Sequence, residues 1–300
     1  MRRLTHVLGI VAVLAVVPAP AAAATFTVTR TDDPTPDGCQ PADCSLREAI
    51  VAANAAGGPD TVTVPGGIYV LAIPPDGTPE DGLDGDLDIG GDLLIQGAGA
   101  RTTVIDANHV DRAIHVCCNL EVDILGVTIS NGRTSSPFGG GGLFASSSDV
   151  ALTGVAVVAN ATTDGNGGGL TVSNATSLLS VRDSVIAGNV ASETGGADGG
   201  GLSNGNQATA VLTNVTVTGN RASQLGGGIE AAGPISLDNV TITGNTATQD
   251  AFYSGESRGG GLAQGGPSAT IENSIVAANS ATDGDPDCHT IGPITSQGHN

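Results

Sequence analysis

The sequence predicts an all-β protein in which short parallel strands are wound into stacked coils, a parallel β-helix. Three observations predict it: a recurring nine-residue phrase, a run of glycines before many of the strands, and a supply of Val, Ile, Leu and Ala with only 2% aromatic residues. The copies of the phrase are residues 124–132, 152–160, 181–189, 212–220, 237–245 and 271–279. Their last residues lie 28, 29, 31, 25 and 34 positions apart. Repeats of this size indicate stacking, because one unit cannot bury its apolar face without a neighbour on each side.

Each copy of the phrase is expected to form two short strands with a bend after each. Apolar residues occupy the first and sixth positions, as at Leu212 and Val217, and the third position is always Gly, Asp or Asn. The ninth position is Asn in five copies and Gly132 in the first. Gly, Asn and Asp tolerate the left-handed backbone that a sharp bend requires. We therefore expect bends at the third and ninth positions.

The glycine runs predict a third strand in each coil. They lie at residues 139–142, 167–169, 199–201, 226–228 and 259–261, and each precedes a Leu or Ile. Three strands per 25 to 34 residues match one coil of a parallel β-helix, which rises about 4.8 Å. The variation in length falls between the ninth position and the next glycine run, so we expect these loops to line up along one side of the stack.

The first 24 residues have the pattern of a secretory signal peptide: two arginines, an apolar run over 7–17, and small residues over 19–24. The apolar run is shorter than the roughly 20 residues that a membrane-spanning helix needs. We expect a secreted, extracellular or cell-surface protein without a membrane span in this chain.

Residues 25–58 are expected to form an N-terminal cap, and residues 59–300 the coils, with further coils expected after residue 300. The cap contains one predicted helix, from about Leu46 to Ala56. Ser45 is its N-cap, Glu48 completes a capping box, and Gly57 ends the helix. A short amphipathic helix at this end would cover the open edge of the first coil.

The charge argues against two classes of partner. The formal net charge is −20, with 30 acidic residues and 10 basic residues that are all arginine. Nucleic acids and anionic membranes need a basic surface, so we expect neither as a partner.

The N-terminal region resembles a family of secreted bacterial proteins. Residues 39–50 read CQPADCSLREAI and contain the CSLREA motif that occurs near the N-terminus of secreted bacterial β-helix proteins. Residues 60–69, 85–89, 95–99 and 111–112 continue in that family's order, so the resemblance covers about residues 25–116. The later coils are similar to the GGA-I and F-x-x-N repeats of polymorphic outer-membrane adhesins, without the aromatic residue. The resemblance implies a right-handed parallel β-helix of the pectin-lyase-like type and an adhesin-like role, and it implies no particular activity.

The cysteines predict one disulfide. Cys39 and Cys44 would close a loop of six residues before the helix, worth about 2 kcal/mol on a chain-entropy estimate. Alternation along the strand around Cys117 and Cys118 predicts an outward Cys117 and an inward Cys118, with a disulfide between them as the alternative. Cys288 has no assigned partner. Together with His109 and His115, the adjacent cysteines fit no zinc-binding spacing.

The acidic segment 76–92 contains the only metal candidates. Asp84, Asp86 and Asp88 alternate with other residues in a glycine-rich loop that could bind calcium, although the order of an EF-hand loop is missing. The alternative is a solvated acidic loop, and we expect no other cofactor.

No catalytic signature is found. The acids on the repeated strands are Asp183, Asp238 and Glu272, and their positions do not predict convergence, whereas hydrolases need two or three convergent carboxylates. The sequence therefore predicts a structural and binding module that contacts extracellular polysaccharide or a host or neighbouring cell surface. The alternative is a polysaccharide lyase or glycoside hydrolase of the pectin-lyase-like type.

Overall fold

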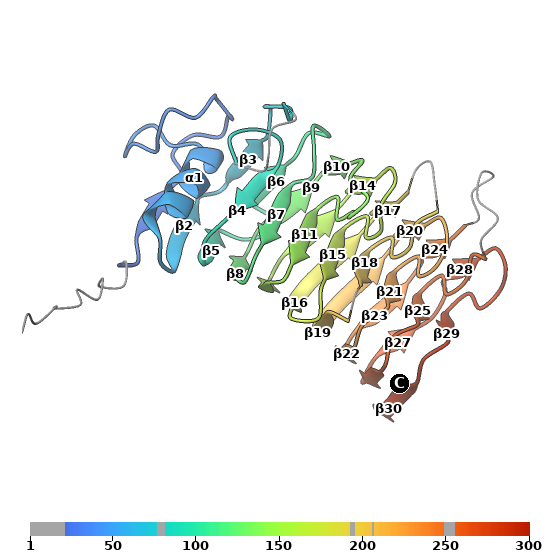
Figure 1. The fold of residues 1–300 in the computed structure, drawn as a ribbon. Helices are drawn as coiled ribbons and strands as arrows, with labels where there is room; N and C mark the ends of the chain where they lie inside the picture. Colours follow the sequence, from blue (N-terminus) through green and yellow to red (C-terminus); the bar gives the residue numbers. More distant parts are fainter. Residues whose placement is uncertain (1–21, 77–81, 193–195, 206, 249–255) are drawn as a thin grey trace, which may run out of the picture.

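The computed structural model describes residues 22–76, 82–192, 196–205, 207–248 and 256–300. Most of the predicted signal peptide, residues 1–21, lies outside the described residues. The described chain is a parallel β-solenoid with one helix, and successive coils are stacked along one axis (Figure 1). The predicted fold class is confirmed.

Three sheets run along the solenoid, and all the strand pairs between coils are parallel. The largest sheet contains the two strands of the nine-residue phrase in each coil. Its strands are β1 (Thr25–Thr27), β2 (Asp60–Val64), β3 (Gly67–Val70), β5 (Leu93–Gly97), β6 (Thr103–Asp106), β8 (Glu121–Leu125), β9 (Thr128–Ser130), β12 (Asp149–Thr153), β13 (Ala156–Val158), β16 (Leu178–Ala187), β19 (Thr209–Thr218), β22 (Ile235–Asp238), β23 (Thr241–Thr243), β26 (Ala269–Glu272), β27 (Ile275–Val276) and β30 (Ile294–Gly298).

The two smaller sheets complete each coil. The six-stranded sheet follows the ninth position of the phrase and contains β10 (Arg133–Thr134), β14 (Ala161–Thr162), β17 (Val190–Ala191), β20 (Arg221–Ala222), β24 (Thr246–Ala247) and β28 (Ser280–Ala281). The eight-stranded sheet contains β4 (Leu87–Ile89), β7 (Ile114–Cys117), β11 (Leu143–Ser146), β15 (Leu170–Ser173), β18 (Leu202–Asn204), β21 (Ile229–Ala231), β25 (Leu262–Gln264) and β29 (Cys288–Thr290). Five of these strands follow the glycine runs, as predicted.

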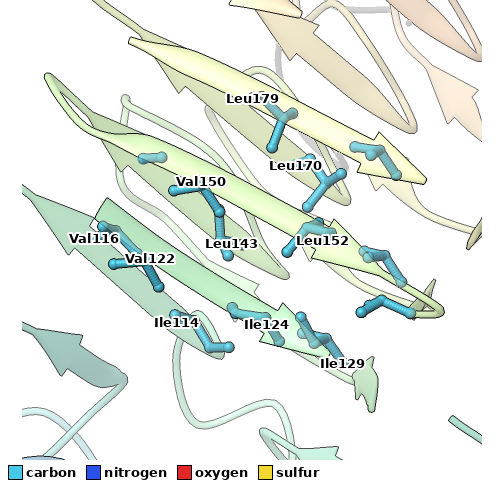
Figure 2. Close-up of a cluster of buried hydrophobic side chains, with 14 of the residues drawn as sticks. Ile114, Val116, Val122, Ile124, Ile129, Leu143, Val150, Leu152, Leu170 and Leu179 are labelled. Carbon is cyan, nitrogen blue, oxygen red and sulfur yellow. The ribbon is translucent and has the colours of Figure 1, made fainter. Parts of the chain in front are cut away.

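The core is a column of aliphatic side chains inside the coils. Each coil contributes inward residues from its strands, and equivalent residues stack in register, as Ile114, Leu143 and Leu170 do. Figure 2 shows this column in three successive coils. The layers are small because Val, Ile and Leu fill them without large aromatic rings, which accounts for the unusual composition.

The predicted bends are confirmed at the third position of the phrase and shifted by one residue at its end. The third-position residues have positive φ angles, for example 60° at Gly126 and 56° at Asn214. At the second bend the left-handed residue is the eighth, not the ninth, for example Gly219 with φ 64°. The prediction of a left-handed ninth residue is therefore wrong. The side chain of that residue instead forms hydrogen bonds between coils.

The ninth-position asparagines form a buried ladder through the solenoid. Each side-chain Nδ2 donates to the Oδ1 of the next asparagine, at 2.9 to 3.0 Å, and also to a backbone carbonyl. The ladder consists of Asn160, Asn189, Asn220, Asn245 and Asn279. Its first acceptor bond comes from the backbone N–H of Gly132, and its last donor bond goes to Asp287 at 3.1 Å. These bonds satisfy backbone groups where each coil turns and no sheet hydrogen bond is available.

Helix α1 (Leu46–Ala56) lies at the N-terminal end of the stack (Figure 1). Ser45 and Glu48 form the predicted capping box, and Leu46, Ala49, Ile50 and Ala53 are buried against the first coil. Within the described ranges, no helix has the length and apolar character needed to cross a membrane.

Candidate functional site

The eight-stranded sheet aligns one row of outward-facing side chains along the solenoid. Residues on either side of this row, such as Ile114 and Val116, point into the core. In spatial order the row is Asp88, His115, Phe144, Thr171, Ser203, Glu230, Ala263 and His289. Its first three members bring a carboxylate, an imidazole and a phenyl ring next to one another.

Asp88 and His115 form a hydrogen-bonded pair on adjacent coils. The Nδ1 of His115 lies 2.9 Å from Oδ1 of Asp88, and Oδ2 of Asp88 accepts a bond from the backbone N–H of Gly82 at 3.0 Å. Burial acts to lower the pKa of His115, but the bond to Asp88 and the negative charges of Asp86 and Asp88 outweigh it, so the pKa is raised. The pair therefore favours a protonated imidazole beside a carboxylate.

A buried ion pair lies beside this hydrogen-bonded pair. Arg112 Nη1 is 3.0 Å from Oδ2 of Asp86, and both side chains are at most 5% exposed. The guanidinium also donates to the carbonyl of Gly139. Burial raises the pKa of Asp86 to about 7, although Arg112 acts in the opposite direction.

Three aromatic rings form a stack that includes His115 and Phe144 from neighbouring strands of the sheet. His115 and Phe144 have ring centroids 5.5 Å apart, Phe144 and Phe138 have centroids 5.7 Å apart, and the planes in both pairs are within 20° of parallel. Arg112 lies over the Phe144 ring at 5.2 Å. Phe144 is 7% exposed, whereas Phe138 is 66% exposed. The stack therefore presents an apolar ring to solvent, and the ring beneath it contacts a guanidinium.

A pocket of about 350 Å³ opens beside Asp88 and His115. Its other lining residues are Asn54, Ile89, Gly90, Cys117 and Cys118. This volume is near the lower end of the range for small-molecule sites, about 300 to 1,000 Å³. The aromatic stack, the Asp88–His115 pair and this pocket form the candidate site.

Helix α1 holds the segment that carries Asp86 and Asp88. The fully buried guanidinium of Arg47 pairs with Asp33 at 2.8 Å. It also donates to four backbone carbonyls, those of Gly82, Asp84, Gly85 and Asp86. About two turns further along the helix, Asn54 donates to the carbonyl of Asp88 at 2.8 Å and accepts from the N–H of Gly90 at 2.9 Å.

The three calcium candidates do not converge. Asp86 and Asp88 lie together with His115, with potential ligand atoms within 4.8 Å of one another, but Asp84 is not in this group and instead accepts a bond from the backbone of Asp76. Calcium takes six to eight oxygen ligands. Asp86 is already paired with Arg112, and both oxygens of Asp88 accept hydrogen bonds, so Asp86 and Asp88 alone supply fewer oxygen ligands than calcium takes.

The cysteines form two disulfides among the described residues. One joins Cys39 and Cys44, the expected pair, with a Cα–Cα distance of 4.3 Å. The other joins Cys117 and Cys118, the alternative considered above. Cys118 is exposed, so the expectation that it points inward is wrong: the strand ends at Cys117, and φ is 109° at Cys118. Cys288 is half-buried and unpaired in disulfides.

A second acidic group lies farther along the same row. Oε2 of Glu230 accepts a bond from Ser203 at 2.7 Å, and burial raises the pKa of Glu230 to about 7, with nearby Asp198 adding to the rise. Burial also raises the pKa of Asp198. Two strands of the sheet, β15 and β18, lie between Glu230 and Phe144, so this group is separate from the candidate site.

The acids on the strands that the sequence singles out have structural partners or lie apart from this site. Asp183, at the third-position bend, accepts a bond from Asn214, and Asp238, the last residue of β22, accepts one from the third-position Asn273. Glu272 is in register with Asp238 on the largest sheet. The site residues that the sequence analysis missed are Arg112, Phe138 and Phe144. The alignment of each glycine run with the strand after it could have found Phe144 but places neither Arg112 nor Phe138.

Comparison with known proteins adds no relative: no family model, no curated protein and no solved structure matches the chain.

Proposed function

We propose that this chain is a secreted or cell-surface binding module that attaches to extracellular polysaccharide through the candidate site and has no catalytic role. The observation that carries the proposal is the exposed Phe138 ring stacked on Phe144, which in turn stacks on His115, the partner of the Asp88 carboxylate. An exposed aromatic face packs against the C–H face of a sugar ring, and carboxylate and imidazole groups bond its hydroxyls.

The ligand class we favour is a neutral polysaccharide. The chain carries a net charge of −20, and at the site the guanidinium of Arg112 is buried and already paired with Asp86. A polymer of uronic acids would meet repulsion from the whole protein.

The finer family assignment is also part of this proposal. The CSLREA residues have defined tasks here: Cys44 forms a disulfide, Ser45 caps the helix, and Arg47 holds the segment that carries Asp86. These roles support membership of the secreted bacterial β-helix proteins with this motif. An export signal at residues 1–24 and an adhesin-like location follow from the same assignment.

Affinity electrophoresis tests the proposal. The purified secreted chain is run through gels that contain neutral or acidic polysaccharides, with calcium or with a chelator, and its retardation gives the affinity. We expect retardation by a neutral polysaccharide, independent of calcium, and a loss of about ten-fold in affinity for Phe138→Ala, equivalent to about 1.4 kcal/mol. Ile291→Ala removes an exposed side chain at the far end of the same sheet and is the matched control. Equal retardation of wild type and Phe138→Ala would contradict the site.

A second candidate function is hydrolysis of the bound polysaccharide. The observation that favours it is the pair of carboxylates Asp86 and Asp88, of which Asp86 has a pKa of about 7 and could donate a proton at neutral pH. Incubation with the same panel and measurement of new reducing ends distinguishes the two functions. New reducing ends that are produced by wild type and not by Asp86→Asn would support hydrolysis as the function. Retention without new reducing ends would support the binding proposal.

A further inference from the structure

The disulfide between Cys117 and Cys118 lies at the candidate pocket. Both cysteines line it together with His115 and Asn54. Cys117 is the last residue of β7 and lies two residues from His115, on the same outward face of that strand. Paired sulfur atoms form an apolar, polarisable surface, which suits contact with the C–H groups of a ligand.

The backbone at this wall is held in an uncommon conformation. Cys118 has φ 109°, a value that residues with a Cβ atom rarely adopt. Three hydrogen bonds to the next coil accompany it: Cys118 and Leu120 donate their N–H groups to Oγ of Ser148, and Asn119 donates to the carbonyl of Ser147. A conformation of this kind persists only where its surroundings fix it, and here one of the constraints is covalent.

The disulfide is open to a reductant because Cys118 is exposed. Reduction by a dithiol is a two-electron, two-proton step. The bond between the two Sγ atoms breaks, each sulfur becomes a thiol, and the dithiol is oxidised to its own disulfide. Cys118 then loses the covalent constraint on its positive φ, so we expect the segment 118–120 to loosen from Ser147 and Ser148 at the wall of the pocket.

We propose that the Cys117–Cys118 disulfide is a redox-sensitive wall of the ligand pocket, so that the oxidised chain binds its saccharide and reduction weakens binding. The part that concerns binding rests on the proposed function, whereas the change in the wall does not.

The experiment measures the wall and the binding separately. Amide hydrogen exchange of Cys118, Asn119 and Leu120 is followed by NMR in the secreted chain, oxidised and after treatment with dithiothreitol, with amides of β15 as the internal reference. We expect reduction to speed exchange at these three amides at least ten-fold and to leave β15 unchanged. The variant Cys117→Ser/Cys118→Ser keeps the Cys39–Cys44 disulfide, so we expect fast exchange at 118–120 already under oxidising conditions and no further response there to dithiothreitol.

The binding arm uses a neutral β-linked glucose hexasaccharide as the probe, titrated into the same samples. We expect at least five-fold weaker binding after reduction and in the double serine variant. The inference would be overturned if the amide exchange rates of residues 118–120 did not change on reduction. It would also be overturned if thiol labelling found Cys117 and Cys118 unpaired in the untreated chain. Equal binding of the hexasaccharide by oxidised and reduced chains would also overturn it and leave the proposed function standing. If reduction speeds exchange at 118–120 but neither the oxidised nor the reduced chain binds the hexasaccharide, the proposed function is contradicted and the redox-sensitive wall is supported.

Discussion

Asn220 shows how one buried side chain joins three coils. Its Nδ2 donates to Asn245 and to the carbonyl of Ile186, and its Oδ1 accepts from both the N–H and the Nδ2 of Asn189, all at 2.9 Å. The side chain is 1% exposed, so no solvent replaces these partners when it is removed. An unsatisfied buried donor or acceptor costs about 1 to 3 kcal/mol.

We therefore predict that Asn220→Ala lowers the free energy of unfolding by about 3 kcal/mol or more, measured by chemical denaturation. The matched control is Asn214→Gly, at the exposed third-position bend, where φ is 56° and where Gly126 and Gly154 hold the same place in earlier copies. Glycine keeps that backbone without strain, so we expect a change below about 1 kcal/mol. Similar losses for the two variants would contradict the importance of the buried ladder.

Glu230 makes stability depend on pH. Its pKa is raised from 4.5 to about 7 in the folded chain, so the folded state binds its proton more tightly than the unfolded state does. The stability that this carboxyl contributes is complete below about pH 4.5 and is lost as the pH rises to about 7. At about 1.4 kcal/mol per pKa unit, the loss is on the order of 3 to 4 kcal/mol.

Glu230→Gln should remove this slope, because glutamine keeps an acceptor for Ser203 and has no charge to bury. We expect the variant to be more stable than wild type at pH 8 and to show little difference at pH 4.5, in denaturant unfolding at each pH. The exposed Glu121 gives the control, Glu121→Gln, which should keep the wild-type slope. A Glu230→Gln profile parallel to that of wild type would show that the carboxyl is not buried in the way described.

At the scale of elements, helix α1 organises the first coils through Arg47. The pairing with Asp33 and with four carbonyls replaces the hydration of a guanidinium that is fully buried. Removal of one partner of such a pair leaves a buried charge and costs about 3 to 5 kcal/mol. This element carries the candidate site because the segment held by Arg47 includes Asp86 and ends next to Asp88.

We predict that Arg47→Met destabilises the protein by about 3 kcal/mol or more and speeds amide exchange over residues 82–90. Arg30→Met is the matched control, because Arg30 forms its ion pairs with Asp32 and Asp43 at the surface, where such pairs contribute about 0 to 1 kcal/mol. Under conditions where Arg47→Met still folds, we expect this variant to be retained less by the polysaccharide than wild type. Arg30→Met should be retained as well as wild type. Normal saccharide retention and normal amide exchange over residues 82–90 in Arg47→Met would contradict the role of helix α1 in holding the site.

The elements differ in how far the sequence predicts them. The helix, its capping box and the strands after the glycine runs follow from local patterns, and the structure has them where those patterns lie. The role of the ninth-position asparagine in the buried ladder does not follow from local patterns. Asparagine is favoured at bends as well as in hydrogen-bonded ladders, so the residue type alone does not distinguish the two roles. The prediction that Cys118 points inward is wrong because side chains alternate only within a strand, and β7 ends at Cys117.

The candidate site was harder to predict because its members come from different coils. Asp88, His115 and Phe144 meet through the register of β4, β7 and β11, and all three strands lie outside the nine-residue phrase that sets the period. The contact of Phe138 with Phe144 depends on the path of the loop between β10 and β11. Composition correctly gave few aromatic residues but could not show that two of the four phenylalanines gather at one place.

At the scale of the whole molecule, the charge predicts selectivity among polysaccharides. A protein with a net charge of −20 repels a polyanion over about 30 Å at 0.01 M salt and over about 8 Å at 0.15 M. We expect retention on a neutral polysaccharide to change little with salt, and weak retention on an acidic one to rise as salt is added. Retention on an acidic polymer that is strongest at low salt would contradict this, since it would require a basic surface.

The stacked architecture also confines binding to one end. The pocket is lined by Asn54 of helix α1 and by residues of β4 and β7, and the aromatic stack includes Phe144 of the next strand, β11. The row on the same sheet continues with Thr171, Ser203, Glu230, Ala263 and His289, where the carboxylate of Glu230 accepts a bond from Ser203 and none of these residues is a phenylalanine. A ligand held by aromatic and carboxylate groups should therefore engage the N-terminal coils and leave the later ones unchanged.

The most direct test of a saccharide site on this sheet is an NMR titration of the secreted chain with a neutral β-linked glucose hexasaccharide. We predict chemical-shift changes concentrated at residues 88–90, 115–119 and 138–144, with the largest changes at His115 and Phe138. Changes confined to the later coils, or no changes at concentrations where a neutral polysaccharide retards the protein in gels, would contradict the account.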